Sequence, residues 1–145
     1  MGTIAYRNLR NYKYQLVKEY SLIITVCPAT DIILPAQEDP FIRLKSNGEL
    51  TIRAQYAWDG PSGPTIDTKN FMRGSLIHDA LYQLIRERIL EPQYRKHADN
   101  ILRTICKEDG MSRFRAWYVW LFVRLFGWFS IQPKKEECNQ IVIAP

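Results

Sequence analysis

The sequence contains little cysteine and none of the patterns that cysteine-based sites require. Its 145 residues include three cysteines, Cys27, Cys106 and Cys138, with no CxxC pair and no cluster of cysteine and histidine. An odd number of widely spaced cysteines argues against a disulfide framework and against a zinc site. We therefore expect this chain to work in a reducing compartment.

The sequence also shows no pattern typical of a targeting segment or a membrane-spanning segment. The N-terminal stretch is polar and rich in tyrosine, without the charged start and apolar core of a secretory signal. Residues 111–129 are the most aromatic part of the chain, but Arg124 interrupts them, and a spanning helix needs ~20 mostly apolar residues. We expect neither a signal peptide nor a transmembrane span.

No dense run of basic residues is present, although the chain as a whole is basic. Its 20 Lys and Arg residues oppose 15 Asp and Glu residues, which gives a formal net charge of +5. Such a surface suits an anionic partner, either lipid headgroups or nucleic acid. Because the charges are spread out and no RNP, KH or zinc-finger pattern occurs, we expect no nucleic-acid partner.

The order of the expected elements indicates an α+β fold, with N-terminal antiparallel strands followed by three helices. The chain is 46% hydrophobic and 12% aromatic, which predicts a single folded domain over residues 1–145. The expected parts are a β-rich segment, a loop with two helices, an aromatic helix and a tail, at residues 1–57, 58–110, 111–131 and 132–145.

The first half of the chain has sequence patterns that predict β-strands. Residues 14–26 alternate with a period of two and predict one strand, whereas three prolines predict a loop or short irregular strand over residues 29–40. Asn47-Gly48 lies between two alternating runs. This pair predicts a tight hairpin, because both residues tolerate a positive φ at little cost.

Helical spacing fills the second half. Thr68 or Asn70 is a candidate cap for the first helix, Pro92 separates it from the second, and Asp109-Gly110 ends the second. The predicted helices are residues 71–90, 93–108 and 112–129. Because the connection at Pro92 is short, we expect the first two helices to pack antiparallel.

Polar residues interrupt the first predicted helix, which is apolar on nearly all sides and therefore buried. His78 and Asp79 lie in its middle, with Tyr82 one turn later. A buried carboxylate needs a cation or hydrogen-bond donors, and a neighbouring histidine can act as a base or a metal ligand near neutral pH. The alternative is a structural pair in which Asp79 bridges to Arg73 or Arg86.

The second predicted helix adds a carboxylate, Asp99, at the margin of its apolar face. Antiparallel packing would let Asp99 approach His78, and a carboxylate that orients a histidine is a recurring acid–base arrangement. His97 points to a different side of this helix, where we expect it to be partly exposed.

These residues carry a family resemblance. His78-Asp79-Ala80-Leu81-Tyr82 with Asp99 downstream resembles the phospholipase A2 active-site pattern, and residues 59–64 (DGPSGP) look like the calcium loop of that superfamily's short prokaryotic members. The stretch from Tyr94 to Asp99 is similar to the phospholipase domains of some viral capsid proteins. Residues 58–100 are also similar to a family of small uncharacterised phage and prophage proteins. The resemblance spans residues 58–106, and it implies that the first two helices pack as they do in phospholipase A2.

The resemblance implies specific roles. His78 would be the general base that activates a water, and Asp99 would hold the His78 tautomer. Tyr82 would either form a hydrogen bond to Asp99 or pack beside it. Asp79 would bind Ca²⁺ together with the loop residues Asp59, Gly60 and Gly63, and no covalent cofactor is implied. The superfamily fixes its catalytic helix with cysteines, but this chain has Gly74 and Ser75 at those positions, so its helix must be held by packing.

Three functions remain open at this point. The resemblance implies a phage- or prophage-encoded, calcium-assisted hydrolase of phospholipid esters. The alternatives are a non-enzymatic virion or host-interaction protein that keeps the scaffold, and a hydrolase of cell-wall or other substrates that uses the same dyad. In each case the chain would be made in the cytoplasm of the bacterial host, and it would associate with a virion or with the periphery of a membrane.

The third predicted helix has two interpretations. It carries one broad apolar face and further aromatic residues beside it. In one interpretation it lies at a membrane surface or against a partner such as a virion protein, with Trp117, Trp120, Phe126 and Trp128 in contact. In the other, which we favour because a small domain needs core, the broad face covers the sheet. That face comprises Phe114, Trp117, Tyr118, Leu121, Leu125 and Trp128.

Overall fold

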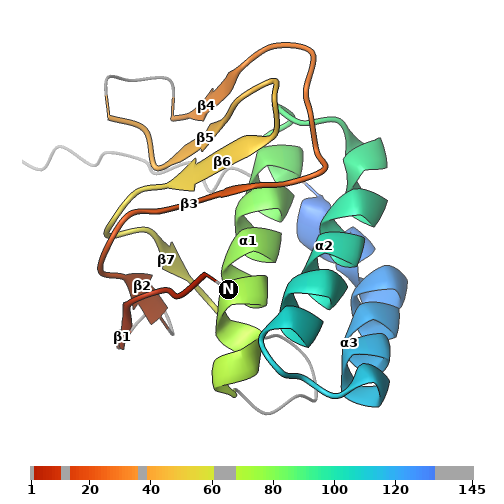
Figure 1. Ribbon diagram of the computed structural model, residues 1–145. Coiled ribbons are helices and arrows are strands. Elements are labelled where there is room, and N and C mark those ends of the chain that lie inside the picture. Colours follow the sequence, from red (N-terminus) through yellow and green to blue (C-terminus); the bar gives the residue numbers. More distant parts are fainter. Residues whose placement is uncertain (1, 11–13, 36–38, 61–67, 133–145) are drawn as a thin grey trace, which may run out of the picture.

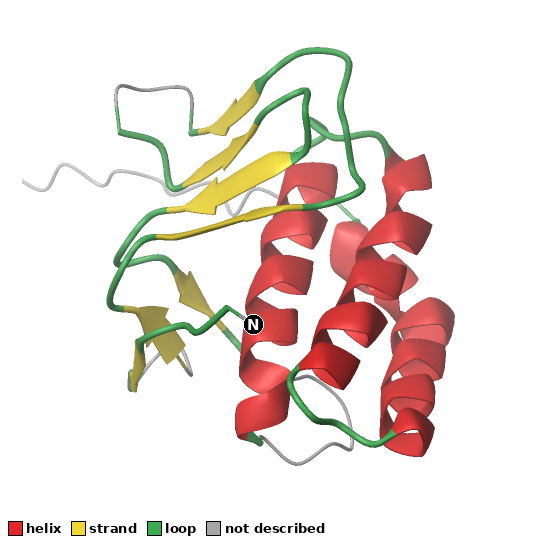
Figure 2. Cartoon of the chain, viewed as in Figure 1, coloured by secondary structure: helices red, strands yellow, loops and turns green. Residues whose placement is uncertain are grey.

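The computed structural model has the expected α+β fold (Figures 1 and 2), and it describes residues 2–10, 14–35, 39–60 and 68–132. Antiparallel strands come first and three helices follow, as the sequence predicted. The strands are β1 (Tyr6–Asn8), β2 (Tyr14–Leu16), β3 (Tyr20–Ile23), β4 (Ile32–Leu34), β5 (Ile42–Leu44), β6 (Glu49–Ile52) and β7 (Ala57–Trp58). The helices are α1 (Lys69–Arg86), α2 (Arg95–Glu108) and α3 (Arg113–Phe126), with 3₁₀ turns η1 (Pro92–Tyr94) and η2 (Gly127–Ile131).

The strands form two separate antiparallel sheets. One has the order β1-β2-β7 and the other has the order β3-β6-β5-β4. The prediction of one strand over residues 14–26 is therefore wrong, because β2 and β3 belong to different sheets. Between them, Val17, Lys18 and Glu19 are all exposed, so the chain bends there without uncovering core residues.

The predicted Asn-Gly hairpin joins β5 and β6. Gly48 has a φ of 89°, and its N–H donates to the carbonyl oxygen of Lys45 at 2.9 Å. The N–H of Lys45 donates in turn to Glu49 at 2.9 Å, so the loop comprises residues 46–48 rather than two residues. Asn47 keeps a negative φ, and its side chain accepts the N–H of Glu49 at 3.0 Å. Only the glycine therefore uses a positive φ, which is typical of a type I turn followed by a bulge.

Replacing Gly48 by alanine is expected to lower the free energy of unfolding by more than the ~1–2 kcal/mol that a positive φ costs other residues. The excess arises because a Cβ at this position would lie 2.3 Å from the carbonyl oxygen of Ile24. Gly110→Ala is the matched control, since Gly110 has a φ of 93° and no atom within 4 Å of its Cβ position. Urea denaturation measures both, and equal losses would contradict the predicted clash.

The three helices match their predicted positions to within a few residues. α1 begins and ends slightly earlier than predicted, with Thr68 at its N-cap position, and the segment after Pro92 forms η1 before α2 begins. The side chain of Ser112 caps α3 by accepting the N–H of Arg115 at 3.2 Å. α1 and α2 run antiparallel side by side, and α3 packs on α2 (Figure 1).

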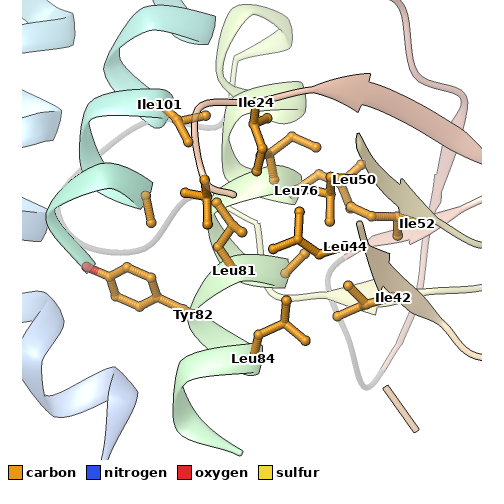
Figure 3. Close-up of a cluster of buried hydrophobic side chains, with 14 of the residues drawn as sticks. Ile24, Ile42, Leu44, Leu50, Ile52, Leu76, Leu81, Tyr82, Leu84 and Ile101 are labelled. Carbon is orange, nitrogen blue, oxygen red and sulfur yellow. The ribbon is translucent and has the colours of Figure 1, made fainter. Parts of the chain in front are cut away.

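The main core lies between α1 and the four-stranded sheet (Figure 3). The inward residues of the sheet alternate along β5 and β6, as a half-buried strand requires. They meet a continuous apolar surface of α1, which is buried along almost its whole length, as predicted. Eight of these side chains have no exposed surface: Ile42, Leu44, Leu50, Ile52, Leu76, Ile77, Leu81 and Leu84.

α3 presents the opposite face from the one that we favoured at the sequence level. Its buried residues are Ala116, Val119 and Val123, which pack in a second apolar cluster with Phe71, Leu102, Cys106 and Met111. The broad aromatic face does not cover the sheet, because α3 packs on α2. The small residues of α3 face α2, since they allow the two helices to approach closely. Within the described residues, no helix has both the length and the apolar character needed to cross a membrane.

Candidate functional site

The middle of α1 supplies three side chains of the site. His78 and Tyr82 are one turn apart on the same face, and their rings lie with centroids 4.0 Å apart. His78 is 7% exposed, whereas the carboxylate side chain of Asp79 is 31% exposed. The helix therefore buries the imidazole ring and leaves the adjacent carboxylate open to solvent on one side.

α2 brings Asp99 to the two residues of α1. Asp99 is completely buried, and its Oδ1 lies 2.7 Å from Nε2 of His78. The hydroxyl of Tyr82 donates to the same oxygen in a short hydrogen bond. The structure thus places together the three residues that the resemblance joined. His97, by contrast, is exposed, with its ring near that of Tyr94.

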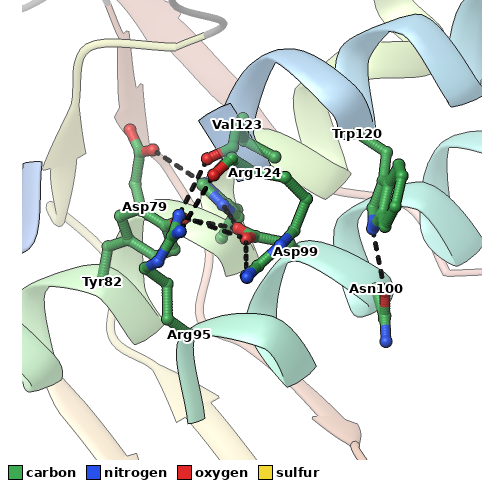
Figure 4. Close-up of polar contacts among 9 residues, drawn as sticks. Asp79, Tyr82, Arg95, Asp99, Asn100, Trp120, Val123 and Arg124 are labelled. Atoms are coloured by element: carbon green, nitrogen blue, oxygen red, sulfur yellow. Dashed lines mark hydrogen bonds and ion pairs between the residues drawn. The ribbon is translucent and has the colours of Figure 1, made fainter. Parts of the chain in front are cut away.

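Two arginines complete the surroundings of Asp99 (Figure 4). Arg124 of α3 donates to Oδ2 of Asp99 at 2.8 Å, and Nη1 of Arg95 lies 3.6 Å from the same oxygen. Arg95 also donates to the carbonyl oxygens of Val123 and Arg124, at 3.0 and 2.9 Å, near the C-terminal end of α3. Asp99 therefore joins all three helices.

These contacts set the charge of Asp99. Burial alone would raise its pKa, but the hydrogen bonds from His78, Tyr82 and Arg124 favour the ionised form and lower the pKa below its usual value. Burial alone would lower the pKa of His78, but hydrogen bonds and charge from Asp79 and Asp99 reverse this, so that the pKa is raised. Both pKa shifts favour the charged forms, so that His78 and Asp99 form an ion pair in the folded protein.

The bond to Asp99 also fixes which nitrogen of His78 can act as a base. An ionised carboxylate only accepts hydrogen bonds, so Nε2 must carry the proton that it shares with Asp99. In the neutral ring, Nδ1 then holds the free lone pair. Nδ1 lies 3.8 Å from Oδ1 of Asp79, on the side of the ring away from Asp99.

A cleft of about 540 Å³ opens beside the imidazole. One part of its wall is polar and includes His78, Asp79, Asp59, Gly60 and Arg86. The other part is apolar and comes from three separate regions of the chain: Leu34, Pro35, Phe41, Phe122, Val123 and Phe126. The size and the mixed lining are typical of small-molecule sites. A second cavity of about 10 Å³ adjoins His78, close to the ~10–15 Å³ that one water needs.

Asp79 and Asp59 are the side chains that would hold calcium. Burial raises the pKa of Asp79, His78 opposes this shift, and the negative charge of Asp59 adds to it. Two neighbouring carboxylates at a cleft form a hard oxygen site whose mutual repulsion a cation would relieve. Within the described residues, no group of three or more His, Cys, Asp or Glu side chains is arranged to hold a metal.

Main-chain oxygens would therefore have to complete the calcium site. Calcium takes six to eight oxygen ligands, which is more than two carboxylates supply. The loop that begins at Asp59 contributes Gly60 to the cleft wall, whereas Gly63 lies outside the described residues. The carboxylate oxygens of Asp79 and Asp59 are ligands of the kind that calcium prefers, so the donor chemistry present fits calcium.

Packing and a hydrogen bond hold α1 where the resemblance would place cysteines. A Cβ at Gly74 would lie 2.9 Å from Sγ of Cys106, so glycine permits the close approach of α1 and α2. The hydroxyl of Ser75 accepts the indole N–H of Trp58 at 3.1 Å and links α1 to β7. β7 is followed directly by Asp59, so this bond also helps to position Asp59 and Gly60 on the cleft wall.

The four predicted membrane or partner residues are not equivalent. Trp117, Phe126 and Trp128 are 42%, 53% and 53% exposed, and Phe126 also lines the cleft. Trp120 is half-buried, and its indole N–H donates to Asn100 at 2.9 Å (Figure 4). Trp120 therefore helps to join α3 to α2.

The roles of Arg95 and Arg124 were not predicted from the sequence. Arg95 lies four residues before Asp99 on one helix, a spacing that predicts an ion pair. Arg124 interrupts an otherwise apolar segment, and a charge in such a place needs a partner. The alternative pairing of Asp79 with Arg73 is wrong, because Arg73 pairs with Glu108 and Asp109, each at 2.9 Å.

The chain belongs to a family described as protein of unknown function (DUF1353), whose model matches residues 43–123, more than half of the sequence. The match runs from β5 to α3 and includes His78, Asp79, Tyr82 and Asp99. Neither a curated protein nor a solved structure matches the chain.

Proposed function

We propose that this member of an uncharacterised family is a calcium-assisted hydrolase of phospholipid esters. The observation that carries the proposal is the placement of His78, bonded to the buried Asp99, on the wall of a cleft that is polar on one side and apolar on the other. The resemblance to the phospholipase A2 active-site pattern is independent support, because it rests on the sequence and not on the cleft.

The proposed reaction is the attack of water on an ester carbonyl. Nδ1 of His78 accepts a proton from the water, the oxygen of the water bonds to the carbonyl carbon, and the ester C–O bond breaks. The proton then passes from Nδ1 to the leaving alkoxide, so the products are a fatty acid and an alcohol. Asp99 stabilises the imidazolium, and Tyr82 and Arg124 hold Asp99 in place.

Asp79 and Asp59 would hold calcium beside the reacting carbonyl. When bound, the ion would polarise the ester and offset the negative charge that develops on its oxygen. The apolar wall of the cleft suits an acyl chain, since Phe41, Phe122 and Phe126 offer aromatic surface without polar atoms. This wall favours a lipid ester over a peptidoglycan substrate.

The direct test is hydrolysis of mixed phospholipid vesicles by the purified chain. We expect release of free fatty acid with calcium and its loss when EGTA removes calcium. Magnesium is the matched control, because its smaller coordination shell holds waters more tightly and it should not replace calcium. Absence of fatty-acid release with every phospholipid and metal tested would overturn the proposal.

A second function, a non-enzymatic scaffold, is favoured by the burial of Asp99. This carboxylate has no exposed surface and joins His78, Tyr82 and Arg124 from two other helices, as a purely structural network would. The scaffold proposal predicts that calcium leaves the melting temperature unchanged, whereas a bound ion would raise it in a concentration-dependent way. A virion protein or a host protein would then be the partner.

A further inference from the structure

The exposed side of α3 and η2 carries a row of apolar side chains, which we call the aromatic stripe. Phe114 is 75% exposed, Leu125 is 62% exposed and Trp128 is 53% exposed. The complete stripe is Phe114, Trp117, Tyr118, Leu121, Leu125 and Trp128. Large contiguous apolar surfaces are rare on soluble monomers and mark sites of interaction.

The stripe is a true helix face and not a scatter of apolar residues. Its members in α3 are spaced by three or four residues, so they lie above one another along one side of the helix. The opposite side is buried against α2 by small residues. In Figure 1, α3 lies on the side of α2 that faces away from both sheets. Packing within the described part of the chain leaves the stripe exposed.

The charged residues of the segment that carries the stripe have one sign. Every charged residue between positions 110 and 132 is an arginine, namely Arg113, Arg115 and Arg124. Arg113 is exposed at the start of α3, whereas the charge of Arg124 is already paired with Asp99 at 2.8 Å. Helices that bind membrane surfaces combine an apolar face rich in tryptophan and phenylalanine with basic residues. This combination fits an anionic lipid surface.

The stripe also continues into the cleft. Phe126 is exposed beside Leu125, and it lines the cleft together with Phe122. A lipid surface in contact with the stripe would therefore lie next to the apolar wall that ends beside His78. An acyl chain could move from the surface into the cleft along aromatic side chains.

We propose that the aromatic stripe binds the surface of an anionic phospholipid membrane and presents the cleft to it. The role of the cleft in this inference rests on the proposed function. Vesicle binding itself does not depend on turnover. The occupant is a lipid surface and not a second protein chain.

The test is co-sedimentation with vesicles in a His78→Gln background, so that hydrolysis cannot alter the lipid. We expect binding to mixed phosphatidylglycerol and phosphatidylcholine vesicles and weaker binding to phosphatidylcholine alone. The double variant Phe114→Ser/Leu125→Ser should lower the affinity by at least ~10-fold, because it removes two exposed apolar side chains from the stripe. Ile23→Ser is the matched control, since Ile23 is 68% exposed on β3.

Three results would overturn the inference. The first is no binding to anionic vesicles, and the second is equal binding by the double variant. The third is self-association of the wild type that the double variant abolishes without any vesicle binding, which would assign the stripe to a second copy. Binding without hydrolysis by the wild type would support the inference and overturn the proposed function. Hydrolysis of a monomeric short-chain phospholipid without vesicle binding would do the reverse.

Discussion

Replacing His78 by glutamine is expected to lower the rate of phospholipid hydrolysis by about 10²–10⁴-fold, the usual contribution of a positioned general base. Glutamine can still donate a hydrogen bond to Asp99 from its amide, but it has no nitrogen that accepts a proton. The loss should appear in kcat, because the imidazole acts on the water and not on the bound lipid.

The chain offers a matched control, because it has two histidines. His97 is exposed on α2 and contacts neither Asp99 nor the cleft, so His97→Gln should keep the wild-type rate. Circular dichroism and the melting temperature establish that both variants are folded. If folded His78→Gln releases fatty acid as fast as His97→Gln, His78 is not the base, and the proposed reaction fails.

The parts of this fold that were predictable are those set by local signals. The Asn-Gly hairpin and the positions of the helices depend on residues close together in sequence. The structure confirms the hairpin, and it places the helix ends within a few residues of the predicted ones. The approach of Asp99 to His78 required one further step, the antiparallel packing that a short connection imposes. Spacing along a helix and a short loop were enough to bring these residues together.

Contacts from distant segments were not predictable in the same way. The cleft takes its apolar wall from residues near β4, β5 and α3, and no sequence pattern links these positions. The predicted orientation of α3 was wrong, because the spacing of apolar residues defines a helix face but does not show which element covers that face. Ala116, Val119 and Val123 allow the helix to pack closely on α2, and this contact leaves the larger residues outside.

Replacing Asp99 by alanine is expected to lower the free energy of unfolding by about 3–5 kcal/mol, the usual cost of removing one partner from a buried ion pair. The variant leaves Arg124 and Arg95 with an uncompensated charge, and it leaves the hydroxyl of Tyr82 and Nε2 of His78 without their acceptor. Urea denaturation at neutral pH measures the loss directly.

The pH dependence of this loss follows from the lowered pKa of Asp99. A carboxylate whose folded pKa is depressed contributes stability above its unfolded pKa, and it loses that contribution as the pH falls through the folded value. The difference between the wild type and Asp99→Ala should therefore be complete at neutral pH and shrink below the ordinary aspartate pKa of ~4. A difference that grows towards acid would contradict the ionised state of Asp99.

A double variant distinguishes the effect of losing the ion pair from the effect of losing the volume of the Asp99 side chain. Asp99→Ala/Arg124→Met removes both charges, and replacing a whole buried pair by apolar groups costs less than removing one partner. We expect the double variant to be more stable than Asp99→Ala alone, with a coupling of about 0.5–3 kcal/mol. Additive losses would mean that Arg124 does not compensate Asp99, and the contact between α2 and α3 would then depend on apolar packing alone.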